Sequence, residues 1–160
     1  MKEDRISQLI KSKQLLKVSS DKERALSLIE SAKNTGEVAL EMELNEKGAT
    51  TIFREIYESI RQLGDALWWI EGYNPQNHEV SIEMLKDTYL NLDFISSEQK
   101  VKLNSLERFK SIRHSANYRG FKISVSQARE ITNFWNSVGK DILKNLKNRL
   151  KEKMDKDKEK

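Results

Sequence analysis

The chain has 160 residues and a mass of 18.7 kDa, enough for one compact domain with a single hydrophobic core. Hydrophobic residues make up 37% and charged residues 34%, so the chain is polar but retains enough large apolar residues to fold. One proline, six glycines and no cysteine exclude a collagen-like sequence, a disulfide framework and a cysteine nucleophile. It has no apolar stretch near the roughly 20 residues of a membrane span and no signal-peptide core at its start, so we expect a cytoplasmic protein without membrane contact.

Positive charge is concentrated in the second part of the chain. Residues 100–160 carry 17 lysines and arginines against 7 acidic residues, whereas residues 1–99 carry 12 against 18. A basic half on a protein of pI about 9.2 favours a phosphate-bearing or an acidic partner. The last ten residues, 151–160, alternate in sign and are expected to form a charged tail after a single domain over residues 1–150.

The spacing of apolar residues predicts helices from the start of the chain, and no segment alternates as a strand would. An amphipathic helix is expected over residues 5–18, within an appended N-terminal segment over residues 1–19. A capping box of Ser20 and Glu23 predicts the start of a second helix. The stretch from Asn34 to Gly36 is expected to weaken or end that helix, and residues 37–46 to resume it.

The longest predicted helix covers residues 49–71, where apolar residues recur at steps of three and four. Residues 72–75 predict a turn, and a shorter helix follows through Ile82 and Leu85. Capping boxes at Ser96 and Ser124 predict two more helices, the first running to residue 116 and the second to residue 150. The predicted fold class is therefore all-α, an up-and-down bundle of about five to six helices.

Few residues indicate a catalytic or ligand-binding function, because phosphate-binding loops, nucleophile elbows and zinc-binding helix motifs are all missing. Trp68 and Trp69 are expected to pack in the core rather than to stack a nucleobase. With two histidines and no cysteine, neither a metal site nor a cofactor is predicted.

The segment from Arg108 to Gly120 gathers groups that suit a phosphodiester. At about 100° per residue, one polar flank of its helix carries Arg113, His114, Asn117 and Tyr118, while Arg108 lies across the apolar stripe. Arginine can bind phosphate, histidine can act as acid or base, and the amide and phenol can donate hydrogen bonds. The alternative interpretation is a solvated helix face near a turn.

Two stretches resemble the HEPN domain family (higher eukaryotes and prokaryotes nucleotide-binding), in particular its short stand-alone prokaryotic and archaeal members. Residues 63–78, LGDALWWIEGYNPQNH, are similar to the family's helix-end pattern EALL…GY.P.SH. Residues 112–120, IRHSANYRG, are similar to its iRN…H/Y.G segment. With the helices between and after them, the resemblance covers roughly residues 20–150, and it places His78 in a turn or at a helix start.

The resemblance implies a bundle of four to five helices that is usually dimeric. Many family members are metal-independent ribonucleases or toxins with an arginine followed, after four to six residues, by a histidine. Aligned on the Tyr-x-Gly exit, the family arginine falls on Arg113, the polar residue after it on His114, and the histidine on Tyr118. A second register pairs Arg108 with His114. We prefer the first register, because Arg113 and Tyr118 flank the same surface.

The resemblance therefore implies an RNA-binding protein. If the protein is also an enzyme, the resemblance implies a metal-independent RNA endonuclease with Arg113, His114 and Tyr118 as catalytic candidates. The predicted binding residues are Asn117, Arg108 and Arg119. A phenol is a poor base near neutral pH, so a non-catalytic nucleotide-binding or protein-interaction module, partnered with a nucleotidyltransferase-like protein, fits as well. A third interpretation is a helical adaptor whose basic half meets an acidic partner.

Overall fold

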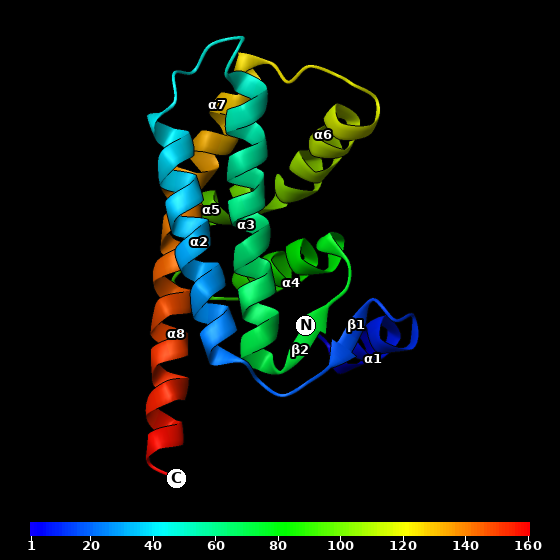
Figure 1. Ribbon diagram of the computed structural model, residues 1–160, viewed down its shortest axis with the longest axis vertical. Coiled ribbons are helices and arrows are strands. Elements are labelled where there is room, and N and C mark those ends of the chain that lie inside the picture. The colour runs from blue at the N-terminus through cyan, green and yellow to red at the C-terminus, as the bar shows by residue number, and fades with distance from the viewer.

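The computed structural model describes all 160 residues and confirms the all-α helical bundle (Figure 1). It holds eight α-helices, one π-helical turn and a two-stranded ribbon. In chain order these are α1 (Glu3–Lys11), β1 (Leu15–Lys17), α2 (Lys22–Glu41), α3 (Ala49–Glu71), β2 (Tyr73–Pro75), α4 (His78–Leu90), α5 (Ser97–Asn104), α6 (Leu106–Tyr118), α7 (Val125–Phe134), η1 (Trp135–Gly139) and α8 (Lys140–Lys158). None of the helices combines the length and the apolar character that crossing a membrane requires.

Helix α3 is the central element of the bundle. It contacts α2 and α8 on one side and α4 and α6 on the other (Figure 1). The apolar row predicted for this helix is buried throughout, because it faces neighbours on both sides. Both tryptophans of α3 belong to the core, as expected, and the indole Nε1 of Trp68 donates to the carbonyl of Val80 at 3.1 Å.

The N-terminal segment differs from its prediction. The helix expected over residues 5–18 ends at Lys11, since Lys13 adopts a left-handed φ of 58°. Strand β1 follows and pairs antiparallel with β2, with Leu15 opposite Pro75. Two strands of three residues each are too short to show an alternating pattern, so the sequence did not predict them.

Helix α2 differs from its prediction at two points, its N-cap and its continuation through Gly36. Its N-cap is Asp21, whose carboxylate accepts from the Arg24 backbone N–H at 2.9 Å, whereas the Ser20 hydroxyl donates to the Ile70 carbonyl. The helix continues through Gly36, which is buried against an indole ring. A Cβ at this position would lie 2.5 Å from the Trp135 ring, so this glycine permits close packing instead of ending the helix.

In the second half of the chain, the predicted capping boxes at Ser96 and Ser124 are both present. The single helix expected between residues 96 and 116 is instead divided at Ser105 into α5 and α6. The predicted last helix is interrupted by the wide turn η1, whose Ser137 carbonyl accepts from the Gln99 Nε2 at 3.2 Å. Each of the six segments predicted as helical contains helix, and these divisions split the last two of them.

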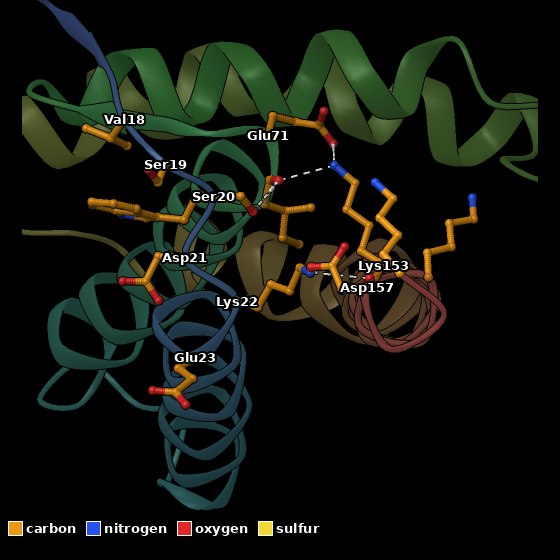
Figure 2. A pocket seen from close by; sticks show the side chains of 13 residues that line it. Val18, Ser19, Ser20, Asp21, Lys22, Glu23, Glu71, Lys153 and Asp157 are labelled. Carbon is orange, nitrogen blue, oxygen red and sulfur yellow. Dashed lines mark hydrogen bonds and ion pairs between the residues drawn. The ribbon is translucent and has the colours of Figure 1, made fainter.

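The segment expected to form a charged tail, residues 151–160, is helical up to Lys158 and contacts the rest of the bundle. Lys153 donates to the Ile70 carbonyl and to Glu71, each at 3.1 Å, at the end of α3 (Figure 2). Lys22, at the start of α2, forms an ion pair with Asp157 and donates to the Lys153 carbonyl. The end of α8 is therefore held against the ends of two other helices.

Candidate functional site

Helix α6 carries the predicted site residues, and its orientation is fixed by aromatic packing. The Phe109 ring lies edge-on to Phe53 of α3 and to Phe134 of α7, with centroid distances of 5.9 and 5.7 Å. Leu106 and Ala116 are buried on the same face of the helix. The polar flank is therefore held away from the core and faces solvent.

Four of the six predicted site residues line one pocket of about 440 Å³, hereafter the histidine pocket. They are Arg113, His114, Tyr118 and Arg119. Residues from α3, from the start of α4 and from further positions on α6 complete its wall. These further lining residues are Tyr57, Asn77, His78, Glu79, Lys110, Ser111 and Ser115.

Arg113 is the half-buried cation of this pocket. Its guanidinium lies over the Tyr57 ring, 5.2 Å from the centroid, and it forms no ion pair. Burial raises the pKa of Tyr57 to about 12, against the opposing effect of the Arg113 charge, so the phenol stays neutral near pH 7. The ring thus positions Arg113 without neutralising it, which leaves the cation available to an anion.

His114 and Tyr118 lie one turn apart on α6, and their rings approach each other. The ring centroids are 4.7 Å apart with an angle of 41° between the planes. Tyr118 is 75% exposed, so its hydroxyl is open to solvent or to a ligand. Tyr118, which the resemblance predicts at the histidine position of the HEPN motif, therefore lies beside His114.

His78 is the residue that sequence reasoning missed as part of the site. It is the first residue of α4, as the resemblance implied for a helix start, and Asn77 caps this helix by accepting from the Glu79 backbone N–H. His78 also lines the histidine pocket, so both histidines of the chain line the same pocket. They are 36 residues apart in sequence, and no spacing pattern could have paired them.

A partly buried charge network lies on α3 near His78. Arg61 forms ion pairs with Glu58 and Asp65, and the Ser81 hydroxyl of α4 donates to Asp65. Burial raises the pKa of Glu58, but the hydrogen bond and charge of Arg61 outweigh burial and hold that pKa below its usual value. Partial desolvation, followed by the Arg61 charge, lowers the pKa of His78. A histidine with a lowered pKa is neutral at pH 7 and can accept a proton.

The distance between α3 and α4 is set by a glycine. A Cβ on Gly64 would lie 2.2 Å from the Ser81 carbonyl oxygen, so only glycine allows the two helices to approach this closely. Because Ser81 follows His78 by less than one turn of α4, this close contact also sets where His78 lies relative to α3.

The remaining two predicted residues lie outside the histidine pocket. Arg108 forms a bidentate ion pair with Glu130 of α7, on the opposite flank of α6, where it lines other pockets. The register that pairs Arg108 with His114 therefore separates the arginine from the histidine. Asn117 is exposed and does not line the pocket, although it lies on the same flank of α6.

No protein-family model matches the chain, and neither a curated protein nor a solved structure matches it.

The lowered pKa of His78 predicts how stability varies with pH. As pH falls below the ordinary histidine value of 6.5, the unfolded chain takes up a proton at this residue before the folded chain does. The free energy of unfolding should therefore fall as pH drops from about 6.5 through the lower folded-state pKa, and this contribution should be constant above pH 6.5. Urea unfolding of the wild type and of His78→Gln should show a shallower dependence in the variant. Parallel curves would contradict the prediction, and His114→Gln, which retains His78, is the control.

Proposed function

We propose that the protein binds RNA in the histidine pocket and cleaves a phosphodiester bond there by metal-independent acid–base catalysis, as a HEPN-like ribonuclease. One observation carries the proposal, namely that both histidines of the chain line the same pocket as the unpaired cation Arg113. Histidine is the side chain best suited to moving protons near neutral pH. Two of them beside an arginine supply a base, an acid and a phosphate ligand.

The reaction that suits this set is attack of an RNA 2′-hydroxyl on the adjacent phosphorus. The base takes the proton of the 2′-hydroxyl as the new O–P bond forms, and the acid gives a proton to the 5′-oxygen as its bond to phosphorus breaks. We assign His78 as the base, because its lowered pKa keeps it neutral, and His114 as the acid. Arg113 binds the non-bridging phosphate oxygens, on which negative charge develops.

The charge of the pocket supports an anionic ligand. Three lining residues are cations, Lys110, Arg113 and Arg119, while Glu79 is the only acidic one. Lys110 is partly neutralised by Glu107, 2.9 Å away. The two arginines form no ion pair and supply most of the available positive charge, which attracts the RNA backbone.

A second candidate is a non-catalytic module that binds RNA or a nucleotide without cleaving it. The observation that favours it is Tyr118, which stands where the family resemblance expects histidine and whose ring lies tilted beside that of His114. RNA that is bound and recovered intact would support this candidate. A homodimer and a nucleotidyltransferase-like partner remain predictions of the resemblance in either case.

Replacing Arg113 by alanine should weaken RNA binding about ten-fold or more at low salt, since a hydrogen bond to a charged group is lost. The loss should be similar for every RNA sequence, because a phosphate contact does not read bases. The slope of log K against log salt should become shallower by about one. Titrations by fluorescence anisotropy at several salt concentrations would measure both quantities.

The matched control is Arg129→Ala, which removes an exposed arginine of α7 that does not line the histidine pocket. It should change affinity and salt slope less than Arg113→Ala does. Equal losses in the two variants would mean that RNA is attracted by overall charge and not by this pocket.

A further inference from the structure

A second pocket of about 260 Å³ lies on the opposite flank of α6, hereafter the Phe121 pocket. Ser111 and Ser115 line both this pocket and the histidine pocket, so the two adjoin across α6. No acidic residue lines the Phe121 pocket. Its other lining residues are Arg108, Ile112, Phe121, Lys122, Ile123 and Gln127.

Phe121 is 59% exposed, although its backbone is held on both sides. Gly120 adopts a left-handed φ of 68°, which turns the chain back after α6, and the Phe121 N–H donates to the Ser115 carbonyl at 3.4 Å. Two residues later, Ile123 is buried, and its N–H donates to the Thr50 hydroxyl at 3.3 Å. The Phe121 ring is therefore exposed to solvent on an anchored segment and does not belong to the hydrophobic core.

Cations precede and follow Phe121 in the sequence, and one of them, Lys122, lines the same pocket as the ring. Arg119 forms no ion pair, and Lys122 lies 4.0 Å from Glu46 with both side chains largely exposed, a pair that neutralises little charge. Arg108 is different, because Glu130 neutralises it. Lys122 therefore supplies an available cation in the pocket of the ring, and Arg119 supplies another in the adjoining histidine pocket. Proteins bind unpaired nucleic acid with this combination, in which bases stack on aromatic rings and cations bind the phosphates.

We propose that the Phe121 pocket binds an unpaired nucleobase next to the phosphate held by Arg113, so that the ligand is single-stranded RNA crossing α6 at Ser111 and Ser115. The base stacks on Phe121, and Lys122 binds a neighbouring phosphate. The Gln127 amide and the serine hydroxyls can donate to or accept from the base edge. This inference rests on the proposed function and adds the class of RNA, because a base inside a duplex is already stacked and does not present its face.

The experiment compares two probes that cannot be cleaved, 2′-O-methyl oligouridine and the same chain without its bases. We expect Phe121→Ala to weaken oligouridine binding about ten-fold, the loss typical of one base–aromatic stack. The variant should leave the base-free chain and the salt slope unchanged, because no phosphate contact is removed. Phe121→Trp should retain wild-type affinity. Phe94→Ala, a control of similar exposure (53%) that lines neither pocket, should have no effect on either probe.

The outcomes separate this inference from the proposed function. If the wild type binds neither probe nor natural RNA, both fail. If Arg113→Ala weakens binding and Phe121→Ala does not, the base site alone is overturned. The base site is also overturned if Phe121→Ala changes the mass measured by light scattering while oligouridine affinity is kept, since Phe121 would then contact a second copy of the chain.

Discussion

Replacing either His78 or His114 by alanine is expected to lower the rate of RNA cleavage by a factor of about 10²–10⁴, the usual contribution of a general acid or base. RNA affinity should change little, because Arg113 remains to bind the phosphate. The two histidines act in one step, so the double variant should be hardly slower than the slower single variant. Single-turnover cleavage of a labelled RNA in EDTA would measure all three rates, since the proposed reaction uses side chains only.

Tyr118→Phe is the matched comparison for this experiment. If the resemblance to the HEPN family is taken as a guide, Tyr118 would stand at the histidine position, and the loss of its hydroxyl would slow cleavage more than His114→Ala does. The histidine pair predicts the reverse order. Cleavage that survives in both histidine variants would rule out the acid–base assignment.

Gly64→Ala is expected to have the largest effect on stability of any single-methyl change near the site. The new Cβ would meet the Ser81 carbonyl, which is backbone and cannot rotate away, so α4 must shift from α3. Overpacking of this kind costs about 3 kcal/mol at its usual upper end. Urea unfolding would measure this loss, and the melting temperature should fall by roughly 6–12 °C. RNA cleavage should fall with it, because His78 moves with α4.

Ser59→Ala is the control for this variant. It changes another buried position of the same helix, where only a hydroxyl bonded to the Glu55 carbonyl is lost. Its cost should be below about 1.5 kcal/mol, the net value of one hydrogen bond, and cleavage should be unchanged. A Gly64→Ala protein as stable and as active as the wild type would show that α3 and α4 can separate without moving the site.

The elements with strong local signals were predictable from sequence. The apolar row of α3 and the capping boxes at Ser96 and Ser124 each depend on residues within one or two turns, and all are present. Gly36 was misread because a glycine inside a helix looks the same whether it ends the helix or admits a distant indole. The ribbon of β1 and β2 depends on pairing between residues nearly sixty positions apart. No local sequence pattern indicates such a pairing.

The candidate site was likewise predictable only in part from the sequence. Arg113, His114 and Tyr118 share one helix, so their spacing alone predicted that they lie together. His78 joins them only because Gly64 lets α4 approach α3, and Phe121 faces the other flank of α6 only because Gly120 turns the chain back. Both positions follow from tertiary packing and from one backbone angle.

The wide turn η1 has a consequence for how the chain tolerates changes in length. A π-type hydrogen bond spans five residues where an α-type bond spans four, so this turn holds one residue more than a regular turn. Deleting the exposed Asn136 would let the turn close as ordinary α-helix, with the apolar residues of α8 still facing α2 and α3. A deletion within α8 itself would instead rotate every later side chain by about 100° and expose that row.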